Sequence, residues 1–232
     1  MHPAVVRIIA QGQGSTSYGS GTLVAVGTRE GLVVTNWHVV NEAIAPVLVV
    51  FPDGFQSIGV VRKADKLWDL AAIVVARPRC EPVPLAVAAA QPGEPLTIAG
   101  YGSGQYRAAS GRCTQYVAPG AKSPFEMVEV AVTARQGDSG GPILNSRGEL
   151  AGVLFGEGGG RTAGSYCGRV RWFLADAVAG LDAAPGGSQV AARPAPAITN
   201  QPLTGTPPRT ARTWRTGPWS CGAGRRARRP RW

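Results

Sequence analysis

A serine between glycines is the strongest chemical signal in this sequence. Ser139 lies in the run Gln-Gly-Asp-Ser-Gly-Gly-Pro of residues 136–142. A serine hydroxyl becomes a strong nucleophile when a base takes its proton and donors stabilise the oxyanion that forms. The glycines allow left-handed turns and let backbone N–H groups approach a substrate carbonyl. The run predicts a nucleophilic serine, and the alternative is a Gly-Ser turn that leads into a strand.

The base must be a histidine on one side of this serine, and the sequence offers only His2 and His38. The glycine-flanked serine also fits the G-x-S-x-G pattern of α/β-hydrolases, but in those enzymes the histidine follows the serine. Here both histidines precede it. His2 lies at the chain end, whereas His38 follows an apolar run at 32–35, where a strand end can hold an imidazole firmly. His38 is the predicted base, against the alternative of a lone histidine satisfied by local hydrogen bonds.

An aspartate between base and serine must orient the imidazole, and there are four: Asp53, Asp65, Asp69 and Asp138. Asp53 belongs to a Phe-Pro-Asp-Gly turn, and Asp138 adjoins the serine and would point away from the imidazole. Asp69 opens the apolar run 70–75, where a carboxylate can be partly buried and fixed. We predict Asp69 as the acid, with Asp65 as the weaker alternative. The resulting chain order His, Asp, Ser is the one that chymotrypsin-like sites use.

The elements that must position these groups are short strands. The chain is 44% hydrophobic and 16% charged, with 32 Gly and 19 Pro among 232 residues, so both turn formers exceed their usual shares of about 7% and about 5%. Apolar runs separated by turn residues form two series. The first series is 4–9, 22–26, 32–35, 47–51, 58–61 and 70–76, and the second is 96–99, 112–117, 127–132, 142–144, 149–155 and 166–171.

Two similar halves predict an all-β fold of two barrels. We place the N-terminal barrel at 1–76, a proline-rich linker at 77–95, the C-terminal barrel with a closing helix at 96–182, and a tail at 183–232. The helix is expected over 171–181, with Trp172, Phe173 or Leu174, and Val178 facing inward. No apolar run approaches the roughly 18 residues of a membrane-spanning helix.

The distribution of charge and the number of cysteines limit which ligands and disulfide bridges the chain can be expected to have. Nine arginines and one aspartate lie in 181–232, so most of the formal charge of +10 belongs to that segment. We expect a solvated, disordered tail, and the alternative is binding of nucleic acid or an anionic surface. With no C-x-x-C pair and two histidines, neither zinc nor another cofactor is expected. The three cysteines before the tail allow one bridge at most, and Cys113–Cys167 is the favoured pair.

Taken together, these motifs resemble the trypsin-like (chymotrypsin-fold) serine peptidases. Residues 35–40 are similar to the segment around the family's base, 69–71 to that around its acid, and 137–142 match its nucleophile signature. Residues 19–24 and 100–102 also resemble family landmarks, so the likeness covers 4–180. The Thr-Asn-x-His-Val-Val form is closest to bacterial HtrA-type members, although no PDZ-like segment follows residue 180.

The resemblance implies a fold and a mechanism. Two perpendicular six-stranded antiparallel barrels would place His38 and Asp69 on the first barrel and Ser139 on the second, with the site between them. Ser139 would attack a peptide carbonyl, and the N–H groups of Gly137 and Ser139 would form the oxyanion hole. The protein would then be a serine endopeptidase that acts on polypeptides without a metal or cofactor. The alternative is a catalytically silent relative used as a binding module.

The resemblance also suggests the substrate pocket and the mode of activation. Thr133 would lie at the bottom of the primary pocket, and Leu154, Phe155 and Gly156 would form its wall and pair with the substrate. An uncharged floor predicts small or medium uncharged side chains at the cleavage site. An Arg-Ile-Ile run at 7–9 is expected inside the first strand, so activity should need no activating cleavage. The family suggests a secreted or periplasmic protein, although the N-terminus has no secretory-signal pattern.

Overall fold

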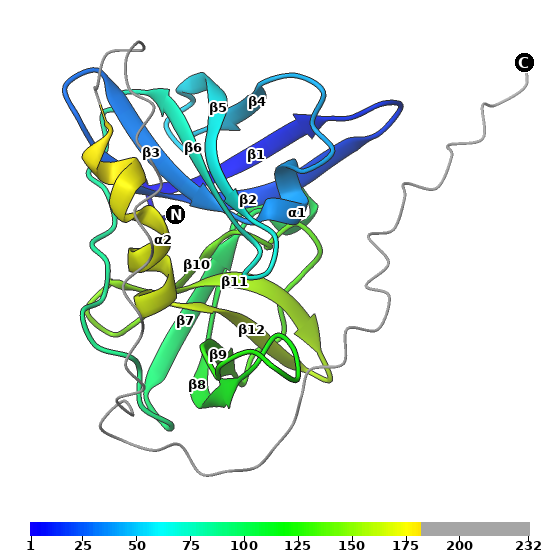
Figure 1. The fold of residues 1–232 in the computed structure, drawn as a ribbon, viewed down its shortest axis with the longest axis vertical. Coiled ribbons are helices and arrows are strands. Elements are labelled where there is room, and N and C mark those ends of the chain that lie inside the picture. Colours follow the sequence, from blue (N-terminus) through cyan, green and yellow to red (C-terminus); the bar gives the residue numbers. More distant parts are fainter. Residues whose placement is uncertain (182–232) are drawn as a thin grey trace, which may run out of the picture.

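The computed structural model describes residues 1–181, which form two closed six-stranded antiparallel β-barrels (Figure 1). The first barrel has the strand order β1-β2-β3-β6-β5-β4 and the second β10-β11-β12-β9-β8-β7. The predicted fold class is therefore confirmed. The strands of the first barrel are β1 (Val5–Gln11), β2 (Thr16–Val26), β3 (Glu30–Thr35), β4 (Val47–Val50), β5 (Gln56–Asp65) and β6 (Leu70–Ala76). Those of the second are β7 (Pro95–Gly100), β8 (Arg107–Val117), β9 (Met127–Val130), β10 (Pro142–Leu144), β11 (Leu150–Gly158) and β12 (Arg161–Tyr166).

Alternating side chains explain why these runs become barrel strands. On β1, Val6, Ile8 and Ala10 are buried while Arg7 and Ile9 are only partly covered, which is the period-two pattern of a strand with one face on a core. The strand β6 is apolar throughout and is covered on both faces, except at its last residues. The strand β6 lies between β3 and β5. Asp69, which directly precedes β6, is therefore buried.

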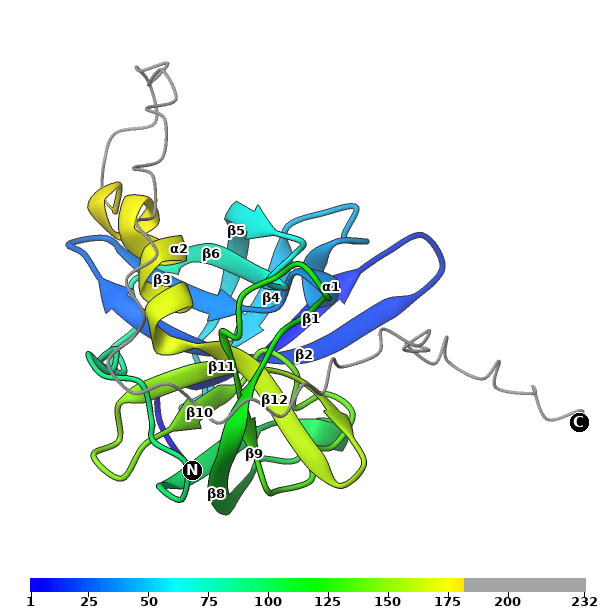
Figure 2. The same cartoon turned by 60° about the horizontal axis from the view of Figure 1, so that its bottom comes forward.

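The helix α2 (Cys167–Ala179) closes the described chain and touches both barrels (Figure 2). It contacts β11 and β12 of the second barrel and β5 and β6 of the first. The predicted strand at 166–171 is wrong, because Cys167, Val170, Phe173, Leu174 and Ala177 form one buried stripe at helical spacing. The helix therefore begins earlier than the sequence indicated.

The predicted inward face of this helix was also wrong in part. Phe173 and Leu174 are buried, but Trp172 and Val178 are 56% and 42% exposed. The Trp172 ring makes cation–π contacts with two basic side chains, because Lys63 Nζ lies 5.9 Å and Arg169 Cζ lies 5.2 Å from its ring centre. Its aromatic face contacts cations on the surface instead of packing into a core.

The predicted Cys113–Cys167 bridge is not formed. Both are free, buried thiols. The Cys113 thiol donates to the Ala90 carbonyl at 3.9 Å and that of Cys167 to the Ala88 carbonyl at 3.4 Å. Each sulfur is thus directed at the backbone of the segment between the barrels.

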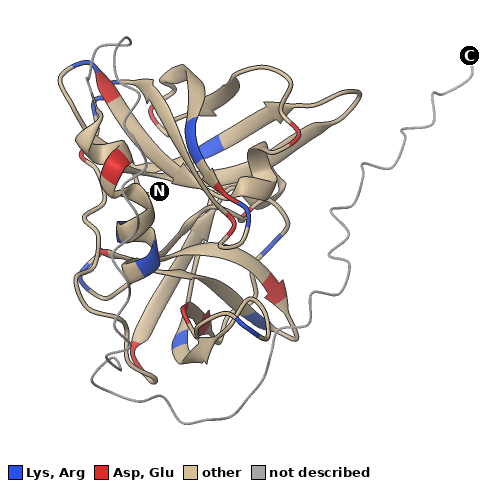
Figure 3. Cartoon of the chain, in the orientation of Figure 1, with Lys and Arg blue, Asp and Glu red and all other residues tan. Residues whose placement is uncertain are grey.

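Charges are few on the described barrels and are spread over both of them (Figure 3). No helix within residues 1–181 has the length and apolarity needed to cross a membrane. The predicted Arg-rich tail lies outside the described residues.

Candidate active site

A short helical turn, α1 (Trp37–Val40), presents His38 to Asp69. The imidazole Nδ1 lies 2.6 Å from Asp69 Oδ2, and the backbone N–H of His38 donates to Asp69 Oδ1 at 2.8 Å. Both oxygens of one carboxylate therefore hold the same residue, one through its ring and one through its backbone. A proton on Nδ1 facing the carboxylate leaves Nε2 as the nitrogen that can accept a proton from a nucleophile.

Asp69 itself has an unusual backbone. It has a φ of +50° and is 4% exposed, and left-handed backbone costs a non-glycine residue about 1–2 kcal/mol. Asn36, 1% exposed, donates from Nδ2 to the Asp69 carbonyl at 2.7 Å. This bond ties the aspartate to the segment that leads into His38, so Asn36 helps hold the strained conformation in place.

The carboxylates of the other three aspartates accept hydrogen bonds from groups other than His38. Asp65 Oδ1 accepts from the backbone N–H groups of Leu67 and Trp68, and Asp53 Oδ1 accepts from that of Phe55. Asp138 is bound by Arg135 and by the backbone of Gly102. Among the four candidates, Asp69 is the one whose carboxylate contacts His38.

The loop that carries Ser139 turns on glycines with positive φ. Gly137 and Gly140 have φ values of +93° and +83°. The Ser139 hydroxyl donates to the Phe155 carbonyl at 3.4 Å, and the Phe155 ring lies edge-on to the His38 imidazole, with ring centres 6.2 Å apart. Phe155 thus contacts both residues, and Ser139 is directed at its carbonyl in place of the imidazole. Catalytic hydrogen bonds are often long or poorly aligned until substrate binds.

The nucleophile loop packs directly on the segment that leads to the histidine. The Ser139 carbonyl accepts from the backbone N–H of Ser20 in β2 at 2.8 Å. A Cβ added at Gly140 would press on Thr35 Oγ1 and on the Ser20 carbonyl, and would lie 3.0 Å from Asn36 N. The structure therefore places Ser139 and His38 on facing parts of the two barrels.

Ser20 holds this loop at a second point. Its hydroxyl, fully buried, donates to the Gly137 carbonyl at 2.8 Å and accepts from the backbone N–H of Tyr101 at 2.8 Å. Ser20 therefore binds the carbonyls of both Gly137 and Ser139, the two residues whose N–H groups were predicted to form the oxyanion hole. Sequence reasoning placed Ser20 in a family-like segment but assigned it no role.

Two of the predicted pocket residues, Leu154 and Phe155, contact the nucleophile loop. Leu154 is fully buried and pairs with the nucleophile loop, because its N–H donates to Gly141 O and its carbonyl accepts from Gly140 N, both at 2.9 Å. The ladder between β11 and β12 shifts register between Leu154 and Gly156, so Phe155 lies at an irregularity. Such bulges often occur beside active sites and re-aim a side chain.

Thr133, predicted at the bottom of the pocket, lies in the segment before the nucleophile loop. Thr133 is exposed, and its carbonyl accepts from Arg107 Nη2 at 2.7 Å. Its neighbours are fixed by Thr162, a buried residue of β12, whose hydroxyl donates to Val132 O at 2.7 Å and accepts from Ala134 N at 3.1 Å. Within the described residues, no group of three or more His, Cys, Asp or Glu side chains is placed to hold a metal ion.

Comparison with known proteins identifies the family of this site. The sequence model described as the trypsin-like peptidase domain matches residues 19–153, more than half of the chain. The chain belongs to that family. A Synechocystis sp. protein named "Putative serine protease HhoA" is 30% identical over 147 residues, which are 58% of this chain and 36% of HhoA. The chain thus spans about a third of the length of this relative.

Solved structures agree with the fold. The active form of the Rv3671c protease from M. tuberculosis is 25% identical, with a TM-score of 0.66 over 75% of this chain and 80% of that one. The serine endoprotease from Yersinia pestis is 21% identical, with a TM-score of 0.66 over 76% of this chain and 63% of that one, a likeness of fold. Both are similar to this chain in the double barrel.

Proposed function

We propose that this protein is a serine endopeptidase in which His38, Asp69 and Ser139 form the catalytic triad. The observation that carries the proposal is the 2.6 Å contact between the His38 imidazole and the buried Asp69 carboxylate, on the barrel face against which the Ser139 loop packs. Membership of the trypsin-like peptidase family supports the same roles. Polypeptides are the proposed substrates.

In the proposed reaction Ser139 Oγ attacks the carbonyl carbon of a peptide bond while His38 Nε2 takes the hydroxyl proton. The tetrahedral oxyanion is stabilised by the N–H groups of Gly137 and Ser139. His38 then gives the proton to the leaving amine, and the peptide C–N bond breaks to leave an acyl-enzyme. Water, deprotonated by His38, hydrolyses the ester and restores Ser139. Asp69 holds the ring tautomer and stabilises the imidazolium throughout.

Substrate selection is proposed to depend on Thr133 and on Leu154, Phe155 and Gly156. Because Thr133 carries no acidic group, we expect a small or medium uncharged side chain at the cleavage site. A digest of a random peptide library followed by mass spectrometry tests this preference. Cleavage mainly after Arg or Lys would contradict it.

Activity is proposed without prior cleavage of the chain. This is supported by Ile8, which is fully buried within β1 and paired with Gly19 of β2. An Arg7–Ile8 bond held in this ladder is a poor cleavage site, since proteolysis favours exposed, flexible segments. The freshly purified, intact chain should hydrolyse substrate without a lag.

Hydrolysis of casein by the purified chain, beside the variant Ser139→Ala, tests the main proposal. We expect release of soluble peptides by the wild type and a loss of about 10³-fold or more in the variant, because no other hydroxyl can replace the nucleophile. Equal activity in the two would contradict the assignment. The trypsin-like fold would then remain without the proposed chemistry.

The second candidate is a catalytically silent binding module. The Ser139 hydroxyl favours it in one respect, because it donates to Phe155 O in this structure. A fluorophosphonate probe separates the two, since it bonds only to an activated serine. Label on the folded wild type that is lost in Ser139→Ala supports the peptidase, and absence of label supports the silent module.

A further inference from the structure

A partly buried arginine without an acidic partner lies beside the nucleophile loop. Arg7 belongs to β1, and none of the ion pairs within residues 1–181 includes it. Its guanidinium instead lies over the ring of Tyr18 in β2, with Cζ 5.0 Å from the ring centre. A guanidinium stacked on a ring keeps its N–H donors around its own edge, where they can bind a carboxylate. Arg7 therefore presents a positive charge and hydrogen-bond donors to an anion from outside the described chain.

The strand pairing places Arg7 next to the nucleophile. Arg7 is paired with Ser20 across the ladder of β1 and β2, and the backbone N–H of Ser20 donates to the Ser139 carbonyl at 2.8 Å. Residues that pair across an antiparallel ladder share one face of the sheet, and on that face the Ser20 hydroxyl reaches the Gly137 carbonyl at 2.8 Å. Tyr18 precedes Ser20 by two residues and so lies on the same face. Arg7 and Tyr18 are therefore on the side of the first barrel that meets the nucleophile loop.

The second barrel adds a wall beside this arginine. A Cβ added at Gly104 would lie 3.7 Å from Arg7 Nη2, so the turn that follows β7 passes close to the guanidinium. Backbone bonds fix the turn, because the Gly104 N–H donates to the Tyr101 carbonyl at 2.8 Å and the Tyr101 N–H donates to the Ser20 hydroxyl at 2.8 Å. We call the surface formed by Arg7, Tyr18, Tyr101 and Gly104 the Arg7 surface. It combines one cation with aromatic and backbone groups that are held in place.

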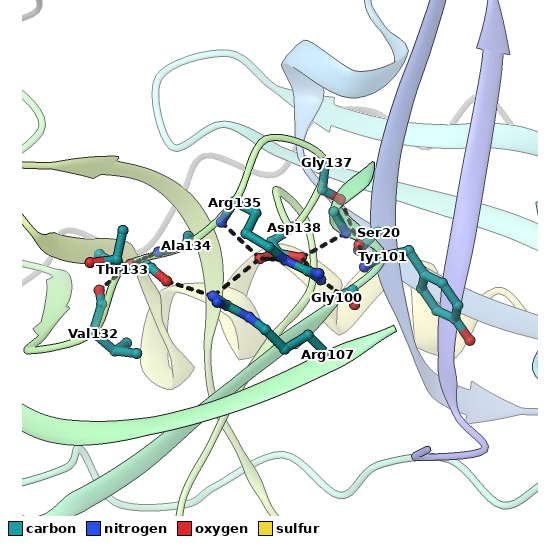
Figure 4. A network of polar contacts seen from close by, with 12 residues as sticks. Ser20, Gly100, Tyr101, Arg107, Val132, Thr133, Ala134, Arg135, Gly137 and Asp138 are labelled. Atoms are coloured by element: carbon teal, nitrogen blue, oxygen red, sulfur yellow. Dashed lines mark hydrogen bonds and ion pairs between the residues drawn. The ribbon is translucent and has the colours of Figure 1, made fainter. Parts of the chain in front are cut away.

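The Arg7 surface lies on the side of the nucleophile loop opposite to the proposed primary pocket. Figure 4 shows Thr133 at one end of a polar network and Tyr101 with Ser20 at the other, with Gly137 between them. A substrate whose acyl part runs toward Thr133 therefore directs its leaving part toward Tyr101 and Ser20. An extended peptide advances about 3.3 Å per residue. One of the first three residues after the scissile bond can therefore bring its side chain to Arg7.

We propose that Arg7 is a specificity residue that binds the carboxylate of an Asp or Glu side chain within the first three residues after the scissile bond. The inference rests on the proposed peptidase function and extends it to the leaving side of the substrate. The guanidinium binds the carboxylate through parallel N–H bonds, a geometry that suits arginine, while the Tyr18 ring supports it from its face. Arg7 takes no part in the bond-breaking steps, so it affects which peptides are cut.

The test measures kcat/KM for internally quenched peptides that share one cleavage site, taken from the library digest. The peptides differ only by Glu or Gln at the first, second or third residue after the scissile bond, and their C-termini are amidated so that no terminal carboxylate competes. A bond between a charged pair that is partly shielded from water is stronger than a surface ion pair, so we expect the wild type to prefer Glu by about five- to tenfold at one of these positions.

Two variants show whether Arg7 is the cause of that preference. Arg7→Gln should reduce the Glu/Gln ratio to about one, because it removes the charge that binds the carboxylate. Arg62→Gln is the matched control and should keep the wild-type ratio. Arg62 lies on β5 of the same barrel, and its Nη1 donates to the Gly180 carbonyl, just after α2, at 3.1 Å.

Charge reversal distinguishes substrate recognition from a loss of folding. Arg7→Glu should prefer Lys to Gln at the position where the wild type prefers Glu, because the sign of the charge is inverted. An unfolded variant cannot gain a new preference. Added NaCl should lower the Glu/Gln ratio of the wild type, because salt screens a pair that remains open to solvent. If neither variant of Arg7 folds, this salt dependence of the wild type decides.

Several outcomes would overturn the proposal. Equal rates for the Glu and Gln peptides at all three positions would do so, as would a Glu preference that Arg7→Gln retains or that salt leaves unchanged. A wild type that cleaves no peptide of the library would contradict the proposed peptidase itself. An active wild type that shows no preference for Glu would contradict the role of Arg7 alone.

Discussion

Substitution of Gly140 by alanine tests the packing of the nucleophile loop against the first barrel. Gly140 has φ +83°, and an added Cβ would press on Thr35 Oγ1 and the Ser20 carbonyl and lie 3.0 Å from Asn36 N. Two of these three atoms belong to the backbone and cannot rotate away. The turn glycine Gly148 is the matched control, because it has φ +75° and no atom within 4 Å of an added Cβ.

The two variants share the cost of a left-handed backbone, but only Gly140→Ala adds a cost of steric overpacking. Left-handed backbone costs each alanine about 1–2 kcal/mol, whereas overpacking adds about 1–3 kcal/mol only at Gly140. For a domain of this size each kcal/mol lowers the melting temperature by about 2–4 °C. Gly140→Ala should therefore melt about 2–12 °C below Gly148→Ala.

Scanning calorimetry measures the melting temperatures, and a fluorophosphonate probe measures the reactivity of the neighbouring Ser139. We expect Gly140→Ala to lose most of the labelling rate, because the loop must move away from Ser20 and Asn36. Gly148→Ala should keep it. Equal melting temperatures and equal labelling of the two variants would refute the close contact between the loop and the first barrel.

Three further predictions concern charge and reactivity. Asp69→Asn should lower kcat by about 10⁴-fold with little change in KM, and steady-state hydrolysis that is less than tenfold slower would contradict its role. Burial alone raises the pKa of Glu129, but hydrogen bonds from Thr114, Arg161 and Gln115 outweigh it and hold that pKa below the usual range of a glutamate. A depressed folded-state pKa gives stability that is present above the unfolded value and lost as the pH falls through the folded one. Glu129→Gln should therefore flatten the loss of melting temperature as the pH falls below the usual pKa of a glutamate, and an unchanged slope would refute this linkage. Burial, with nearby Glu94 and Glu129, raises the pKa of the Cys113 thiol to about 11. At pH 8 a thiol reagent followed by peptide mapping should modify the half-buried Cys80 before Cys113, and the reverse order would contradict it.

The barrel architecture was predictable because most of its strands have an apolar or β-branched composition. Runs such as 70–76 are β-branched or apolar throughout and lie between turn residues. The strand β12 was missed because its sequence, Arg-Thr-Ala-Gly-Ser-Tyr, has little β propensity. Its buried polar residues make specific bonds instead, with the Ser165 hydroxyl donating to the Trp68 carbonyl at 2.8 Å. Such contacts depend on a partner 97 residues away.

In the candidate site, the partner of His38 was predictable. Asp69 was preferred to Asp65 because an apolar run follows it, and its carboxylate does contact His38. The contacts that Ser20 and Arg135 make with the nucleophile loop could not be predicted. Ser20 and Gly137 are separated by 117 residues, and nothing in the residue types indicates that a serine hydroxyl will bind that carbonyl. Side-chain networks of this kind become visible only when the two barrels are placed together.

The proposed function requires that His38 activates Ser139 as a nucleophile. Its most direct test is the mass of the intact chain after reaction with a fluorophosphonate, with the modified residue located by peptide mapping. We expect one adduct per chain, on Ser139, formed by the wild type and not by His38→Ala. An adduct on another residue, or equal labelling of the His38→Ala variant, would contradict it.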